Sequence, residues 1–170
     1  MTSPTTNALP VPGAVLAPAG AADAAEILVL QRCCWVTEAI ENDRLDVPAL
    51  HESAEQVRER VRTRPHWTVR LDGRLVGGVG ARLLADGKTW DIGRLMVAPD
   101  LAGRGLGRAL LAFAEGQAPP GVTTFTLFTG ERSVRNRRMY ARAGYGDVRP
   151  ARLPDGTPVP GAVMMDKPAL

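Results

Sequence analysis

Cysteine and histidine are scarce in this chain of 170 residues, which has two of each. The cysteines are neighbours, Cys33 and Cys34, and adjacent cysteines rarely bridge each other, so the sequence contains no disulfide framework. Because His51 and His66 are the only histidines and no CxxC pair is present, we expect no metal site. We interpret the two cysteines as small apolar residues that pack in a helix.

Long apolar runs and a strong excess of one charge are also missing. No stretch approaches the roughly 20 apolar residues needed to cross a bilayer, and no Lys or Arg precedes Arg32, as it would in a signal peptide. Lys and Arg total 21 against 18 acidic residues, an excess too small to indicate nucleic-acid binding. We therefore expect a cytoplasmic protein without membrane or nucleic-acid partners. Locally, "ERSVRNRRMYAR" (131–142) carries five arginines, which favours an anion site there.

The balance of residue types is typical of a single globular domain. Apolar residues make up 45% of the chain and charged residues 23%, which is enough for a sizeable core. Residues 1–13 are rich in Pro and Thr and lack periodicity, so they are predicted to form a flexible tail. Residues 14–170 show no internal repeat and are predicted to form one domain.

Hydrophobic periodicity predicts alternating helices and strands after the tail. Helical spacing runs from Asp23 to about Asn42, and "SAEQ" at Ser53 matches a capping box that begins a second helix. Three β-rich runs separated by turn residues then predict an antiparallel meander. The other expected elements are strands at 14–17, 122–129, 145–149 and 162–167, and helices near 106–116 and 133–144, with the meander at 67–71, 74–84 and 89–97. The expected fold class is α+β.

Glycines alternate with other residues in "LAGRGLGRALL" (101–111), directly before a helical pattern. A helix start presents unpaired N–H groups and the positive end of the helix dipole, and glycine lets a phosphate approach them closely. The stretch lacks the Lys-Ser/Thr of a Walker loop and does not fit G-x-G-x-x-G. It indicates either an anion site or a tight strand-to-helix turn.

The segments "LMVAPDLAGRGLGRALL" (95–111) and "NRRMYARAGY" (136–145) together resemble the GNAT superfamily of acetyl-CoA-dependent N-acetyltransferases. The resemblance extends over roughly residues 14–168. It implies a GNAT-type α+β fold, with a mostly antiparallel mixed sheet of six to seven strands and about four flanking helices. The family's phosphate signature, Gln/Arg-x-x-Gly-x-Gly/Ala, falls on 102–107, where Ala102 stands in place of the Gln or Arg. The effect of Ala102 on cofactor affinity stays open, since main-chain donors survive.

The resemblance implies that the chain binds acetyl-CoA as cosubstrate. The pyrophosphate would lie on the N–H groups of the glycine loop, and the pantetheine arm would run along the preceding strand, which splays from the next one. An N–H near Met96 would face the thioester oxygen, and Ser133 would be a helix N-cap. The implied cofactor-binding residues are Leu95, Met96, Val97, Gly103, Arg104, Gly105, Leu106, Gly107, Arg108 and Asn136.

In this family an amine attacks the thioester directly, in a ternary complex. Tyr140 matches the tyrosine that protonates the departing sulfur, and Asp91 occupies the strand position where some members carry a catalytic glutamate. By strand alternation, Asp91 is predicted to share a face with Leu95 and Val97. Both residues keep a plain alternative, since Tyr140 could pack in the core and Asp91 could be an ordinary strand-end carboxylate.

The helix expected over 23–42 is the one that usually lines the acceptor cleft in the family. Trp35, Glu38 and Glu41 on this helix are candidate acceptor-binding residues that would hold a cationic amine, or they form an ordinary charged face. The predicted activity is N-acetyl transfer from acetyl-CoA to a primary amine of a small molecule or peptide. A non-catalytic acyl-CoA-binding module on the same fold is the alternative, and Tyr140 favours the enzyme. The acceptor, the acyl donor beyond acetyl, the general base and the choice between monomer and homodimer stay open.

Overall fold

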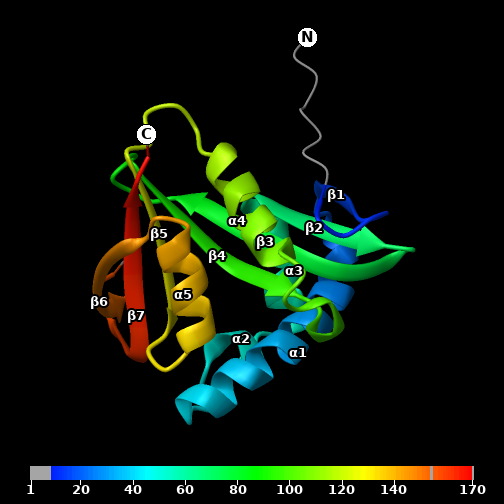
Figure 1. Ribbon diagram of the computed structural model, residues 1–170, viewed down its shortest axis with the longest axis horizontal. Coiled ribbons are helices and arrows are strands. Elements are labelled where there is room, and N and C mark those ends of the chain that lie inside the picture. Colours follow the sequence, from blue (N-terminus) through cyan, green and yellow to red (C-terminus); the bar gives the residue numbers. More distant parts are fainter. Residues whose placement is uncertain (1–8, 154, 170) are drawn as a thin grey trace.

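The computed structural model describes residues 9–153 and 155–169, so most of the predicted tail, residues 1–8, lies outside the described part (Figure 1). The rest of that stretch, residues 9–13, leads into strand β1 (Val15–Pro18). Val11 is only 3% exposed, and its carbonyl accepts a hydrogen bond from the Ala14 N–H at 3.1 Å. Val11 therefore belongs to the packed part of the protein.

Seven strands form one mixed sheet in the order β1-β2-β3-β4-β5-β7-β6. All neighbouring strands are antiparallel except β4 and β5, which are parallel. The predicted meander is β2–β4, and the sheet confirms the expected fold class. The strands after β1 are β2 (His66–Leu71), β3 (Arg74–Leu83), β4 (Thr89–Val97), β5 (Thr124–Gly130), β6 (Gly146–Arg152) and β7 (Pro158–Pro168).

Five α-helices are present in residues 9–153 and 155–169. They are α1 (Ala24–Asn42), α2 (Pro48–His51), α3 (Ala54–Thr63), α4 (Leu106–Gly116) and α5 (Val134–Arg142). The capping box predicted at Ser53 is confirmed, because Gln56 N–H donates to Ser53 Oγ at 3.2 Å and Ser53 N–H donates to Gln56 Oε1 at 2.8 Å. The short α2 was not predicted, since four residues are too few to show a period.

Helices cover the two faces of the sheet differently. Helix α4 lies over β3 and β4 (Figure 1), where Leu110 packs close to Gly77 and the Trp90 indole N–H donates to the Ala114 carbonyl at 2.9 Å. On the opposite face of the sheet, the ring of His66 from β2 lies over Gly80 of β3 and leaves no room for a Cβ there. Helices α1 and α3 pack together on that second face.

A β-bulge interrupts β4 at Arg94. The register changes from Gly80↔Gly93 to Gly78↔Met96, so two steps along β3 face three steps along β4. The extra residue, Arg94, has φ of 51°, a left-handed conformation that is uncommon for a non-glycine residue. Such an insertion reverses the alternation of side chains beyond it.

The bulge therefore corrects one prediction about β4. Asp91 forms an ion pair with Arg82, which lies on the same face of β3 as Gly78. On this face a Cβ at Gly78 would lie 3.1 Å from the Met96 side chain. Val97, in contrast, lies on the α4 face, 3.7 Å from the Cβ position of Gly107. Asp91 thus does not share a face with Val97 or Leu95, because strict alternation does not hold across Arg94.

Candidate active site

Strands β4 and β5 pair only along the first third of β4 and then separate. Their parallel pairing runs only from Thr89↔Thr124 to Asp91↔Thr126, although β4 continues to Val97. The Ala98 N–H donates to the Val76 carbonyl of β3 at 2.7 Å, so by alternation the main chain of Met96 also faces β3. The main-chain groups of Leu95 and Val97 then face the gap between β4 and β5.

Helix α1 crosses near this gap. The Cys34 thiol donates to the Val97 carbonyl at 3.2 Å, and burial raises the pKa of this thiol to about 11. Cys34 is thus a protonated, half-buried helix residue, whereas Cys33 is exposed. The contact confirms that the Val97 carbonyl is turned away from β3.

The glycine loop follows the end of β4 directly. After the 3₁₀ turn η2 (Pro99–Leu101), Gly103 and Gly105 have φ of 81° and 82°, values that strain any residue with a side chain. Gly105 is the N-cap of α4, and the first helical bond is donated by Ala109 to its carbonyl. The N–H groups of residues 106–108 consequently have no partner within the helix.

Neighbouring segments narrow the space around the loop. A Cβ on Gly107 would lie 3.4 Å from Met139 Sδ of α5, which is van der Waals contact, so the start of α4 packs against α5. Arg104 and Arg108 are exposed on the loop. The Arg135 guanidinium, one of the five arginines of 131–142, comes within 4.0 Å of the Cβ position of Gly103. Arg135 brings a positive charge to a loop whose Ala102 supplies none.

Tyr140 lies in the interior, with 7% of its surface exposed. Its ring meets that of Tyr145 edge to face, with centroids 6.2 Å apart, and the Tyr145 hydroxyl donates to Glu115 Oε1 at 2.9 Å. Burial, and next the nearby Glu38 carboxylate, raise the pKa of Tyr140. The Tyr140 hydroxyl therefore keeps its proton and is available as a donor.

Glu38 joins the end of α1 to the start of α5. Its carboxylate accepts from Ser133 Oγ at 2.8 Å and from the Asn136 side-chain amide, while Asn42 donates to Ser133 Oγ at 2.9 Å. Burial raises the pKa of Glu38, and exposed Glu41 adds to this effect. Ser133 is the N-cap residue of α5, as predicted, but its hydroxyl oxygen makes no capping bond and accepts from the Asn42 side chain instead.

The remaining predicted residues lie on the face of the sheet that α1 covers. Asp91 is engaged by Arg82 at 2.7 Å and is 14% exposed. The Trp35 ring, half-buried, stacks below the Arg94 guanidinium with 5.7 Å to the ring centroid. In the described residues, no three His, Cys, Asp or Glu side chains gather as metal ligands would, and no helix is both long and apolar enough to cross a membrane.

Comparisons with known proteins place these features in a family. The model of the acetyltransferase (GNAT) family matches residues 25–145, while no curated protein sequence matches the chain. Among solved structures, PaiA N-acetyltransferase from Thermoplasma acidophilum, in complex with coenzyme A, superposes with a TM-score of 0.74 at 14% identity, covering 91% of this chain and 98% of that one.

Two further structures are similar over nearly the whole chain. The ribosomal-protein-S18-alanine N-acetyltransferase from Escherichia coli has a TM-score of 0.65 at 17% identity, covering 92% of this chain and 94% of that one. Aminoglycoside 6'-acetyltransferase type Ii has a TM-score of 0.69 at 20% identity, with 92% and 97% covered. At these identities the structures support the fold, and the family model covers most of the chain. The chain belongs to the GNAT family of acetyltransferases.

Proposed function

We propose that the protein is an acetyl-CoA-dependent N-acetyltransferase that acts on a primary amine in a ternary complex. The observation that carries this proposal is the separation of β4 from β5 directly before a glycine-rich helix start. This arrangement offers main-chain pairing for an extended arm and unpaired N–H groups for a pyrophosphate at its end. The CoA-bound PaiA structure, which has the same fold, supports the assignment.

The cofactor contacts follow from the direction of the main chain. The N–H groups from Gly103 to Arg108 would bind the pyrophosphate, with Arg135 nearby, and Leu95 and Val97 would pair with the pantetheine arm. The resemblance to the family predicted an oxyanion donor near Met96. Because the Met96 main chain faces β3, we assign this role to the Leu95 N–H. One such donor stabilises a transition state by about 3 kcal/mol.

The acid–base residues are assigned by their surroundings. The amine nitrogen forms the new bond to the acetyl carbon while the carbon–sulfur bond breaks, and one proton moves overall from the amine to the sulfur. Tyr140 would donate to the departing sulfur. For the base we prefer Glu38 to Asp91, because burial raises the pKa of Glu38, whereas Asp91 must first give up its ion pair with Arg82. Asn136 orients the Glu38 carboxylate.

Binding and turnover test the proposal together. Acetyl-CoA and CoA, but not ATP, should raise the melting temperature, and a panel of amines should release thiol from acetyl-CoA. Tyr140→Phe removes one hydroxyl and should reduce kcat by about 10²-fold, as loss of a general acid does, with little change in CoA affinity. Thermal stabilisation by CoA without any amine-dependent thiol release would instead indicate the acyl-CoA-binding module.

The same assay separates the two candidate bases. Glu38→Gln should lower kcat/KM most at low pH, where the amine is protonated, with partial recovery as rising pH deprotonates it. Asp91→Asn should have the smaller effect. A larger loss in Asp91→Asn, with the same recovery at high pH, would return the role to Asp91.

A further inference from the structure

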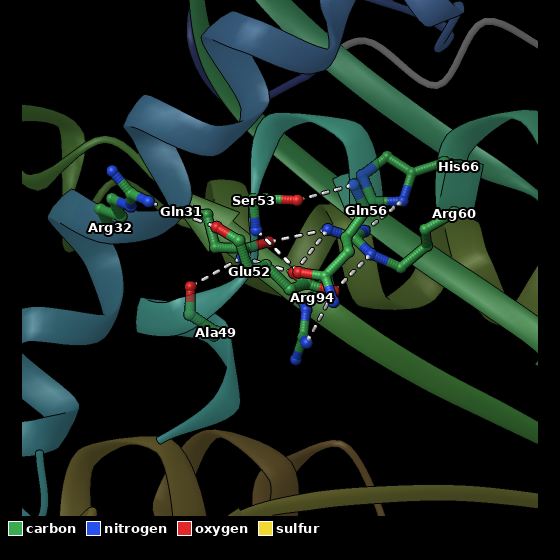
Figure 2. A network of polar contacts seen from close by, with 9 residues as sticks. All are labelled: Gln31, Arg32, Ala49, Glu52, Ser53, Gln56, Arg60, His66 and Arg94. Carbon is green, nitrogen blue, oxygen red and sulfur yellow. Dashed lines mark hydrogen bonds and ion pairs between the residues drawn. The ribbon is translucent and has the colours of Figure 1, made fainter. Parts of the chain in front are cut away.

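Five polar residues from five different segments meet beside the bulge of β4, and we call them the Glu52 cluster (Figure 2). They are Gln31 of α1, Glu52 before α3, Arg60 of α3, His66 of β2 and Arg94 of β4. The two guanidinium groups approach the same carboxylate, Arg60 at 3.1 Å and Arg94 at 3.4 Å. Gln31, fully buried, donates to Glu52 Oε2 at 2.7 Å and accepts from Arg60 at 2.8 Å.

The Glu52 cluster carries more positive than negative charge. The side chains of Arg60, Glu52 and Arg94 are only 11%, 17% and 20% exposed, so two guanidinium groups share one carboxylate away from water. His66 does not change this balance, because burial, and then the two arginines, lower its pKa to about 3 and keep it neutral. An unbalanced charge at such a site is costly unless an anion pairs with it.

Arg94 is the member with spare hydrogen-bonding capacity. Arg60 uses its Nε and both terminal nitrogens on Glu52, Gln31 and His66. Among the described residues, the polar contact of Arg94 is the 3.4 Å pair with Glu52, and its buried Nε has no partner. A guanidinium has five donors in a planar fork that matches a carboxylate. The main chain of Arg94 is also strained, with φ of 51°, and strained residues are found most often at functional sites.

Contacts with helix α1 relate Arg94 to the proposed acetyl-transfer centre. Gln31, Trp35, Glu38 and Asn42 are spaced by four, three and four residues, so they share one face of α1. Trp35, which stacks on Arg94, and Glu38 are separated by roughly 4.5 Å along the helix axis, at 1.5 Å per residue. Arg94 therefore stacks on a residue that precedes Glu38 on α1 by less than one helical turn, and Arg94 directly precedes Leu95 at the gap.

We propose that the acceptor is an amine that also carries a carboxylate, as an amino acid does, and that Arg94 binds this carboxylate while the amine faces Glu38 and Tyr140. The proposal rests on the proposed acetyltransferase function. It gives the excess positive charge of the Glu52 cluster an anion, and it orients a zwitterion along α1. Arg94 then determines specificity without taking part in the chemistry.

Matched pairs of amines with and without the carboxylate provide the test. We would measure thiol release with L-lysine against cadaverine, L-tyrosine against tyramine, and L-methionine against 3-(methylthio)propylamine. In at least one pair the amino acid should have a kcat/KM about tenfold or more above that of its partner, as expected for one charge-assisted contact. Arg94→Gln should remove this preference mainly through KM, and Arg94→Lys should restore part of it.

A control and a binding measurement exclude a purely structural role of Arg94. Arg32→Gln removes an exposed arginine that contacts only the main chain of Glu52 in the cluster, at 3.3 Å, and it should keep the preference. Calorimetric titration of the same amino acids into the CoA-loaded protein should show binding that Arg94→Gln abolishes while CoA affinity is kept. Equal or better use of the amines without a carboxylate, or an unchanged preference in Arg94→Gln, would overturn the proposal.

The binding measurement also separates the two proposals. Binding of an amino acid through Arg94 without thiol release would support the carboxylate site and contradict the acetyltransferase function. Thiol release with amines that lack a carboxylate, at rates that Arg94→Gln leaves unchanged, would support the function and overturn the site.

Discussion

His66 shows at the scale of a single residue how burial determines protonation. Its ring, 5% exposed, fills the place where a Cβ on Gly80 would lie 2.6 Å from Nδ1, so Gly80 cannot carry a side chain without displacing it. Burial, and then Arg60 and Arg94, lower the His66 pKa to about 3. The unfolded chain therefore takes up a proton below pH 6.5 that the folded chain does not.

This difference predicts an acid-sensitive fold. A folded-state pKa below the unfolded value of about 6.5 means that His66 weakens the fold as pH falls from 6.5 towards 3, by about 1.4 kcal/mol per pH unit. Between pH 7 and pH 5 this amounts to about 2 kcal/mol in the free energy of unfolding. His66→Gln should reduce the loss measured by urea denaturation at the two pH values, even if it lowers stability at pH 7.

The other histidine provides the matched control. His51 is exposed, so His51→Gln should leave the pH dependence of unfolding as it is in the wild type. An equally steep loss of stability in His66→Gln and the wild type would show that His66 is protonated in the folded protein.

At the scale of one element, the start of α4 depends on the absence of side chains. Gly103 and Gly105 supply left-handed turns, and at Gly107 the helix start lies close to Met139 and Val97. Three glycines in five residues lose more conformational entropy on folding than other residues would, but they leave the N–H groups of the loop open to close approach. Ala102 stands where the family has Gln or Arg, and Arg135 of α5 brings a positive charge to the same loop from a different element.

We predict that Gly107→Glu abolishes CoA binding while the protein stays folded. The new carboxylate would lie at the positive end of α4, where we propose that the pyrophosphate binds. Like charges near 4 Å repel by a few kcal/mol, so affinity should fall by about 100-fold or more. Calorimetric titration with CoA measures the effect. Gly116→Glu, at the other end of the same helix and with no neighbour within 4 Å of its Cβ, should bind CoA as the wild type does; equal affinity in both variants would refute the loop assignment.

At the scale of the whole molecule, the segment before β1 packs against the core and against the loop at the start of α4. Val11 is 3% exposed and belongs to the core, and the Pro10 ring lies 3.6 Å from the Cβ position of Gly105. A segment that the composition suggested was a tail therefore packs against the loop that begins α4.

Val11→Ala should lower the free energy of unfolding by about 1–3 kcal/mol, because it removes two buried methyl groups and leaves a cavity. Val15→Ala is the matched control in β1, since Val15 is 63% exposed, and should change stability by less than about 0.5 kcal/mol. Urea unfolding of both variants measures the difference. Equal stability of the two would mean that the 9–13 segment does not contribute to the fold.

The order of the elements and the glycine loop were predictable from the sequence alone. Helical periodicity in 23–42, the capping box at Ser53 and the turn residues between the meander strands are local signals, and local geometry follows from neighbours in the chain. The glycines of 103–107 could be singled out in the same way, because a close main-chain approach needs glycine wherever it occurs. Tyr140 was singled out by the resemblance to the family, and its role stays a prediction.

The tertiary structure decided which groups meet. The bulge at Arg94 turned Asp91 away from the face of Val97, a change that alternation along one strand cannot show. Contacts between Glu38 and Ser133, 95 residues apart, and between the five segments of the Glu52 cluster depend on register and helix packing. The sequence determined the elements and the residue types at their ends, while pairing between distant segments determined which charged groups lie close together, because electrostatic contacts act through space.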